Sequence, residues 1–218
     1  MSGEPGRFPR PEGGAGFATR YNRWRYNLYA PVYDRVVAAF FAPRRRRAIA
    51  LLAPRPDERI LLLGAGTGLD LDYLLGCRRL TAIDVSDGML ARLHRRAARL
   101  GLEVEASVMD GQRLAFPDAC FDAVILHLIL AVIPDPVACL REVERVLKPG
   151  GRVVVFDKFL ADHQRPVWWR AAANQLTRII ATDINRQLGV IVSPTTLHIE
   201  HDESAGMGGF FRIVLLRK

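Results

Sequence analysis

Apolar and polar positions along the chain switch repeatedly between two patterns. Apolar residues spaced three and four positions apart predict helices, including one that follows Ser86 and one that follows Pro134 and Asp135. The apolar run at 60–63 predicts a strand covered on both faces, as in the middle of a parallel sheet, and further strands are predicted at 79–83, 103–108, 121–126 and 152–156. Such alternation of strands and helices indicates an α/β fold.

The last third of the chain predicts further elements of the same kind. A helix is expected at 167–180, continuing helically at 183–188, and strands at 196–201 and 209–216 are expected to form an antiparallel edge. Trp168 and Trp169 suit either the core or a substrate surface, and core packing is the preferred interpretation. The Lys-Pro-Gly-Gly sequence at 148–151 predicts a tight turn before the strand at 152–156.

The N-terminal part of the chain differs in composition from the rest. Residues 1–18 are rich in glycine, proline and charge and are predicted to be disordered. Two amphipathic helices are predicted at 19–29 and 31–42, followed by Pro43, the arginine run at 44–47 and a helix through Leu52. We therefore divide the chain into this tail, a lid or membrane-contact segment at 19–53, and a catalytic domain at 54–218.

Most of the net charge of +8 belongs to the N-terminal segment, because residues 1–47 contain ten arginines and three acidic residues. Arginines with interleaved aromatic residues suit an anionic membrane surface, and they also suit nucleic acid. A third interpretation is a lid over a ligand pocket whose arginines are merely solvated. The apolar residues Val36, Val37, Phe40 and Phe41 favour lipid, since a phosphate-tracking surface has no need of them.

A glycine-rich loop follows the first strand of the domain. Gly64, Gly66 and Gly68 follow the apolar run, and a helix is predicted to begin at Leu69, so that its N-terminus could face an anionic ligand group. A dinucleotide-binding loop would have glycine or alanine at the position of Leu69, so that fingerprint fails at its third element. An ordinary strand-to-helix turn is the remaining alternative.

Two aspartates end strands beside this loop. Asp84 lies twenty positions after Gly64, where a Rossmann-like sheet presents a carboxylate to ribose hydroxyls; the alternative is a helix-start carboxylate, although Ser86 already supplies a cap. Asp110 follows the strand at 103–108 and could accept a hydrogen bond from an adenine amino group, or could simply form an Asp-Gly turn.

His127 ends the strand at 121–126, over the crevice where open α/β sheets bind ligands. Its imidazole could accept a proton or orient a substrate, or it could be hydrogen-bonded near the cofactor or to the backbone. Three scattered cysteines in apolar surroundings predict buried reduced thiols, and no metal site is expected: Cys77, Cys120 and Cys139.

Four motifs together resemble class I S-adenosylmethionine (SAM) methyltransferases: Leu-Leu-Leu-Gly-Ala-Gly-Thr-Gly, Ile-Asp-Val-Ser-Asp-Gly-Met-Leu, Asp-Gly-Gln-Arg-Leu-Ala-Phe-Pro-Asp-Ala-Cys-Phe-Asp and Arg-Val-Leu-Lys-Pro-Gly-Gly. The resemblance covers about residues 58 to 157 and implies a Rossmann-like, seven-stranded, mostly parallel sheet with helices on both faces. It implies SAM as the cofactor, held by Tyr33, Gly64, Ala65, Gly66, Gly68, Asp84, Val85, Met89, Asp110, Gly111, Gln112 and His127.

Within that family, the tyrosine-rich N-terminal helices and the Asp-Ile-Asn-Arg stretch look like bacterial phospholipid N-methyltransferases acting on phosphatidylethanolamine. The related ubiquinone and menaquinone C-methyltransferases share Ala-Pro-Val-Tyr-Asp-like N-terminal segments, which leaves a quinone precursor as the alternative acceptor. The catalytic candidates are His127 and Tyr21, and the candidates for holding lipid phosphate are Arg20, Arg23 and Lys158.

These inferences predict a cytoplasmic enzyme associated peripherally with the inner face of the membrane, with no apolar run of the ~18 residues that a spanning helix needs. The expected partner is a lipid substrate at an anionic surface; nucleic acid is disfavoured and no required protein partner is evident. A non-catalytic SAM- or membrane-binding module is the competing functional class.

Overall fold

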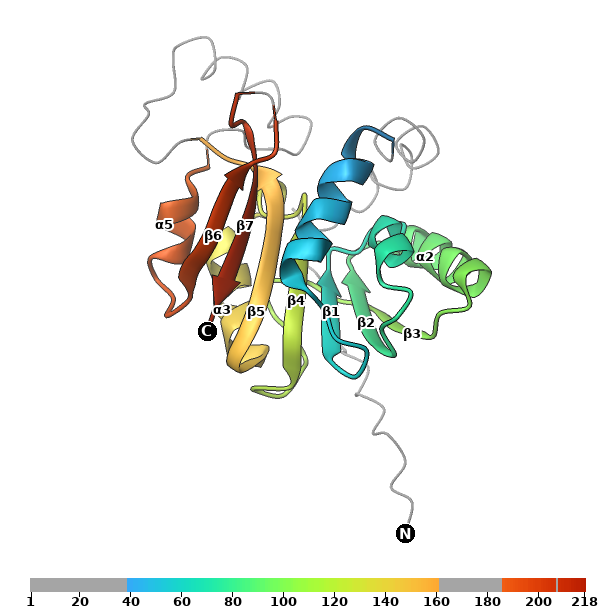
Figure 1. The fold of residues 1–218 in the computed structure, drawn as a ribbon. Coiled ribbons are helices and arrows are strands. Elements are labelled where there is room, and N and C mark those ends of the chain that lie inside the picture. Colours follow the sequence, from blue (N-terminus) through green and yellow to red (C-terminus); the bar gives the residue numbers. More distant parts are fainter. Residues whose placement is uncertain (1–38, 161–185, 207) are drawn as a thin grey trace.

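Seven strands form a single sheet in the order β3-β2-β1-β4-β5-β7-β6 (Figure 1). The computed structural model describes residues 39–160, 186–206 and 208–218. Neighbouring strands from β3 to β5 are parallel, whereas β7 is antiparallel to both β5 and β6. The predicted Rossmann-like, mostly parallel sheet with an antiparallel edge is thus confirmed.

The observed strands agree with most of the predicted ones to within two residues. They are β1 (Arg59–Leu63), β2 (Arg79–Asp84), β3 (Val104–Val108), β4 (Phe121–His127), β5 (Leu147–Lys158), β6 (His198–Ser204) and β7 (Phe211–Arg217). The predicted turn at 148–151 lies within β5 and forms an irregularity there: pairing passes from Phe121–Leu147 to Ala123–Arg152 with a shift of register. Gly150 has φ +73° and allows the backbone to turn at this point.

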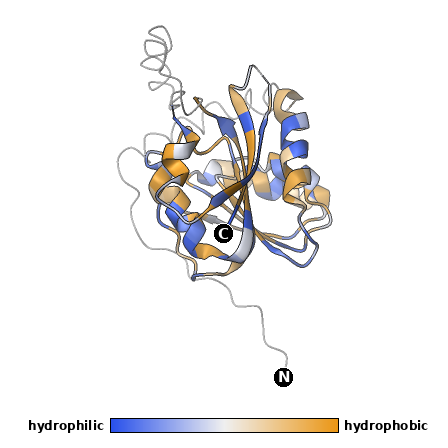
Figure 2. Ribbon diagram, turned by 60° about the vertical axis from the view of Figure 1, so that its left-hand side comes forward, coloured by the Kyte–Doolittle hydropathy of each residue, from blue (hydrophilic) through white to orange (hydrophobic). Residues whose placement is uncertain are grey.

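Helices cover both faces of the sheet. One face carries a helix at 39–52, the 3-10 helix η1 (Leu69–Tyr73) and α2 (Asp87–Leu100); the other carries α3 (Pro136–Val146) and α5 (Leu188–Val192). Alternate residues of β1 point to opposite faces of the sheet: Leu61 and Leu63 belong to one core cluster, and Ile60 and Leu62 belong to the other. Figure 2 shows hydrophobic and hydrophilic stretches alternating along the covering helices. Among the described residues, no helix combines the length and hydrophobicity needed to cross a membrane.

The helix after the second strand begins where the sequence predicts. The Ser86 hydroxyl accepts a hydrogen bond from the Met89 amide at 3.3 Å, and Gly101 ends α2 in the left-handed conformation. Asp135 caps α3 in the same way, accepting from the Ala138 amide at 2.9 Å. Both caps are local features, which is why the sequence alone identified these two helix starts.

The three cysteines are buried and free, as predicted.

The predicted helix end at residue 42 is wrong, because the helix at 39–52 continues through Pro43. A proline inside a helix removes one backbone hydrogen bond. Tertiary packing on both sides of Pro43 compensates: the Phe41 ring lies edge-on to the rings of Phe156 and Phe211, with centroids 5.5 and 5.2 Å away. Further along, Ala48, Ile49 and Leu52 are buried in the core. The N-terminal helices predicted at 19–29 and over most of 31–42 lie outside the described residues.

The predicted helix from Leu69 is also shorter than expected. It is a 3-10 helix of five residues, in which the Leu71 and Leu74 amides donate to the carbonyls of Gly68 and Leu71. So short a segment has little macrodipole of its own, and the approach of an anionic ligand group to its N-terminus stays a prediction.

The helical continuation predicted at 183–188 begins only at its end. Gln187 pairs with Leu160 in an isolated bridge, the Leu160 amide donates to the Arg186 carbonyl, and α5 starts at Leu188. Residues 183–185 and the helix predicted at 167–180, with Trp168 and Trp169, lie outside the described residues.

The burial of Leu52 predicts that the helix at 39–52 contributes to global stability. Leu52→Ala should lower the free energy of unfolding by about 2–5 kcal/mol, because it opens a cavity between this helix and the sheet. The matched control is Leu75→Ala, whose side chain is 59% exposed and should change stability by less than about 0.5 kcal/mol. Urea denaturation followed by circular dichroism measures the free energy of unfolding of both variants. If Leu52→Ala lost as little stability as Leu75→Ala, the helix would not be part of the core.

Candidate functional site

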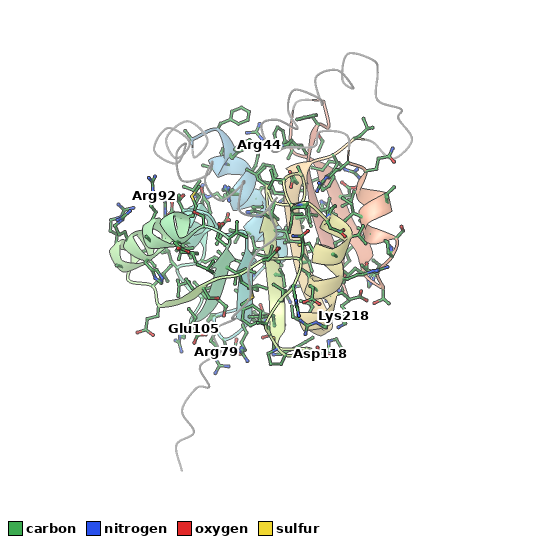
Figure 3. The ribbon with its side chains drawn as sticks, turned by 180° about the vertical axis from the view of Figure 1, so that it is seen from behind. Arg44, Arg79, Arg92, Glu105, Asp118 and Lys218 are labelled. Carbon is green, nitrogen blue, oxygen red and sulfur yellow. The ribbon has the colours of Figure 1, made fainter. Side chains whose placement is uncertain are left out.

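A cavity of about 350 Å³ opens at the carboxyl ends of the parallel strands, a size within the usual range for small-molecule sites. It lies beside β1 and β4, where the chain order of the sheet reverses. Figure 3 shows Arg79, Asp118 and Lys218 at the opposite end of the sheet from Arg44. The predicted site residues that line this cavity are Gly64, Ala65, Gly66, Asp84, Val85, Met89, Gly111, His127 and Lys158.

Other predicted site residues do not line the cavity. Gly68 faces the protein interior, where a Cβ would lie 3.0 Å from the Leu93 side chain. Asp110 and Gln112 are hydrogen-bonded to each other and are not among the residues that line the cavity. The remaining predictions, Arg20, Tyr21, Arg23 and Tyr33, lie outside the described residues and stay predictions.

The glycine loop forms one wall because its backbone takes a conformation that other residues rarely adopt. Gly64, Gly66 and Gly68 have φ values of +68°, +55° and +79°. A Cβ at Gly64 would lie 2.7 Å from Cδ1 of Ile129, whereas one at Gly66 would meet no protein atom within 4 Å. The space over Gly66 is therefore open to a ligand, while Gly64 allows the loop to pack closely against Ile129.

Asp84 ends β2 with its carboxylate held by the loop. One oxygen accepts from the Gly66 amide and the other from the Ser86 amide, each at 2.9 Å. Burial raises the pKa of this carboxyl, and the backbone hydrogen bonds oppose that shift. Each oxygen still has lone-pair capacity that could accept from ribose hydroxyls at the cavity wall.

Asp110 forms the Asp-Gly turn that the sequence offered as its alternative role. Its Oδ1 accepts from the backbone amide of Gln112 at 3.0 Å and from the Gln112 side-chain amide at 2.8 Å. Gln112 in turn accepts from the Asp135 amide at 2.8 Å, which links this turn to the start of α3. The turn presents Gly111 to the cavity, and the adenine contact of Asp110 stays a prediction.

A buried network of three charged or titratable groups lies under the cavity. Asp70, in η1, places Oδ1 2.7 Å from Nδ1 of His127 and Oδ2 2.7 Å from Nη1 of Arg45. The three side chains are at most 9% exposed. Arg45 comes from the helix at 39–52, so the network joins this helix, η1 and the end of β4. His127 and Arg45 also line the cavity.

The network determines how Asp70 titrates. Burial alone would raise the pKa of its carboxyl, but the charge of Arg45 and the interaction with His127 outweigh burial and hold that pKa well below its usual range. Asp70 is therefore ionised at neutral pH.

Lys158 is a second titratable group on the cavity wall. Burial lowers the pKa of its ammonium group, and the charge of the adjacent Asp157 opposes that shift.

Sequence reasoning missed Asp70 and Arg45. Arg45 was counted within a basic run, yet 45, 48, 49 and 52 share one helical face, and the last three are apolar and buried. Two neighbours in that run also have internal partners: Arg47 pairs with Glu203 at 2.8 Å, and Arg44 donates to the Ala205 carbonyl at 2.6 Å. Three of the four arginines at 44–47 therefore have hydrogen-bond or ion-pair partners within the protein.

Comparisons with known proteins agree with this geometry. The sequence model of a family described as "Methyltransferase domain" matches residues 61–155. The chain is 35% identical over 144 residues to phosphatidylethanolamine N-methyltransferase of Cereibacter sphaeroides, covering 65% of this chain and 68% of that protein. It is 40% identical over 140 residues to demethylmenaquinone methyltransferase of Thermus thermophilus, covering 61% and 63%. Each match thus spans roughly two thirds of the relative's length.

Among solved structures, a SAM-dependent methyltransferase from Methanosarcina mazei superimposes with a TM-score of 0.61 at 20% identity, covering 78% of this chain and 96% of that one. The cavity residues fit SAM, the cofactor that the resemblance implied. Gly66 leaves space for close backbone approach, Asp84 offers a carboxylate to hydroxyls, and Val85, Met89 and Met109 offer apolar surface to a purine.

The open space over Gly66 leads to a prediction about the cofactor. Gly66→Ala should weaken SAM binding at least about tenfold, because the new methyl group occupies the ligand's approach, and should destabilise the fold by about 1–2 kcal/mol through the left-handed φ. Gly101→Ala is the matched control: it has φ +68°, no neighbour within 4 Å and a position at the end of α2. Calorimetric titration with SAM should find its affinity unchanged; equal weakening in both variants would attribute the effect to backbone strain.

Proposed function

Because the chain belongs to the class I SAM-dependent methyltransferases, we propose that it methylates the amine of phosphatidylethanolamine at a membrane surface. The observation that carries this proposal is the imidazole of His127. Its ring lines the cavity, and its Nε2 atom is buried and has no hydrogen-bond partner among the described residues. A buried nitrogen without a protein partner has unused hydrogen-bonding capacity, which a ligand that reaches it could satisfy.

The acceptor's protonation state explains why such a nitrogen is useful. An ethanolamine amine is an ammonium ion at neutral pH and has no lone pair with which to attack. A histidine can remove that proton near neutral pH, provided that its free nitrogen lies within hydrogen-bond reach of the amine. The geometry of His127 therefore suits an amine acceptor.

Bound SAM supplies an electrophilic methyl group on a sulfonium. The residues of this chain then have to hold the acceptor in line with that methyl group and keep water out, which can account for much of the acceleration. Phe41, Ile129 and Phe211 provide an apolar wall to the cavity. Tyr21 is proposed to close over the methyl group.

Binding of a lipid phosphate group requires positively charged side chains. Lys158 lies on the cavity wall, and none of the described residues forms an ion pair with it within 4.0 Å. Since Arg44, Arg45 and Arg47 have internal partners, the proposed contact with anionic lipid depends on Arg20, Arg23 and their neighbours in the N-terminal segment. The first relative described above, whose name includes phosphatidylethanolamine, supports this acceptor.

A quinone precursor is the second candidate acceptor, favoured by the 40% identity to demethylmenaquinone methyltransferase. The apolar wall of Phe41, Phe211 and Ile129 would suit a flat ring, and His127 would then remove a proton from a ring hydroxyl.

Methyl transfer from labelled SAM distinguishes the two acceptors. We expect label in mono- and dimethylated phospholipid when vesicles contain phosphatidylethanolamine, and none with vesicles of phosphatidylcholine alone, whose nitrogen is already fully methylated. A demethylated naphthoquinol is assayed in parallel. Label only in the quinol would contradict the phospholipid proposal, and label in neither, with SAM binding intact, would favour a non-catalytic module.

His127→Gln tests the proton acceptor. Glutamine can still donate to Asp70 but cannot take the ammonium proton, so kcat should fall about 10²–10⁴-fold while SAM affinity stays within about threefold. His94→Gln, on the exposed side of α2, is the control and should keep wild-type kcat. Unchanged turnover in the His127 variant would remove this histidine from the chemistry.

A further inference from the structure

We propose that Asp70, kept ionised by Arg45, is a positioning residue that fixes the tautomer of His127 so that the Nε2 lone pair faces the acceptor. This inference rests on the proposed function, in which His127 removes the acceptor's proton, and it adds two residues to that step. Neither residue needs to touch the substrate. Both act through the imidazole ring.

The direction of the hydrogen bond between Asp70 and His127 follows from the third member of the network. An ionised carboxylate can only accept hydrogen bonds, so the Nδ1 atom 2.7 Å from Oδ1 must carry the proton. In a neutral imidazole the other nitrogen, Nε2, then bears the lone pair. The opposite tautomer would place a proton on Nε2 and two lone pairs face to face at Nδ1 and Oδ1.

Arg45 makes the carboxylate's charge tolerable in this buried position. A carboxylate transferred from water to the interior without a counter-charge tends to take up a proton, and a protonated Asp70 could donate to Nδ1 and select the wrong tautomer. The Arg45 guanidinium, 2.7 Å from Oδ2, supplies the counter-charge. Its buried position beside Asp70 thus serves the orientation of His127.

The ring of His127 is also held by packing. It lies edge-on to the Phe156 ring, with centroids 5.8 Å apart and planes at 82°. Phe156 packs in turn against Phe41 and Phe211. This packing opposes a flip that would exchange the two nitrogens. The other charged groups on the cavity wall are Asp84, at the end of β2, and Lys158, at the end of β5.

The chain offers a matched control for Asp70. Asp72 lies in the same 3-10 helix and also pairs with an arginine, Arg96, at 3.0 Å, but its side chain is 40% exposed and it does not line the cavity. Asp70→Asn and Asp72→Asn therefore make the same chemical change two residues apart. Only the first alters the group that faces His127.

The first experiment is nuclear magnetic resonance of the full chain with ¹⁵N-labelled histidine and saturating SAM, using His127→Gln to assign the signal. We expect the neutral His127 ring to carry its proton on Nδ1 in the wild type and in Asp72→Asn, and on Nε2 in Asp70→Asn, where the Asn amide donates to Nδ1. A wild-type ring protonated on Nε2 would overturn the inference. The wild-type spectrum alone gives this result if Asp70→Asn does not fold.

The second experiment measures methyl transfer to phosphatidylethanolamine vesicles as a function of pH. Asp70→Asn should lose kcat about 10²-fold or more, with SAM affinity within about threefold, and raising the pH should not restore it because Nε2 then carries a proton in the neutral ring. Wild-type kcat in this variant, or recovery at high pH, would contradict the positioning role. The tautomer measurement needs no acceptor, so a wrong phospholipid assignment leaves it decisive.

Discussion

The left-handed turn between β1 and η1 is the constraint on which the rest of the site depends. Gly64, Gly66 and Gly68 all have positive φ, and a Cβ at Gly64 would lie 2.7 Å from the Ile129 side chain. Only glycine can make this turn without strain and close contact. The turn has two consequences: it leaves open space over its own backbone, and it brings Asp70, two residues later, beneath the cavity beside the end of β4. The wall of the cavity and the position of Asp70 beside His127 are therefore products of one backbone feature.

The buried carboxylate of Asp70 requires three separate segments of the chain to pack together. Removing a carboxylate from water is costly, and the cost is offset only if its partners are correctly placed. Here the partners lie 25 and 57 residues away in the sequence, in the helix at 39–52 and in β4. The network can form only when three separate segments have packed together. For the same reason, loss of one partner leaves an uncompensated charge, which destabilises a protein more than the intact network stabilises it.

The sequence predicted those features that depend on local pattern. Ser86 was identified as a cap and Asp84 as a strand-end carboxylate because neighbouring residues suffice to define both positions. Asp70 was missed because its burial depends on pairing with Arg45, 25 residues earlier in the chain. Helical spacing places Arg45 on a buried face but does not identify its partner. The helix through Pro43 was missed for a similar reason, since contacts of Phe41 with strands far along the chain outweigh a local breaker. Hydrophobic periodicity predicts elements along the chain, but it does not predict which residues from distant elements pack together.

The distribution of cavity residues explains why the donor is established while the acceptor is a proposal. The family match ends at residue 155 and includes the glycine loop, Asp84 and His127, all of which line the cavity. Phe41, Lys158 and Phe211 line the same cavity from outside that range. The cavity of this chain is therefore completed by segments that flank the matched domain. Arg45 also lies outside the match, so the counter-charge of Asp70 comes from a segment that precedes the matched domain.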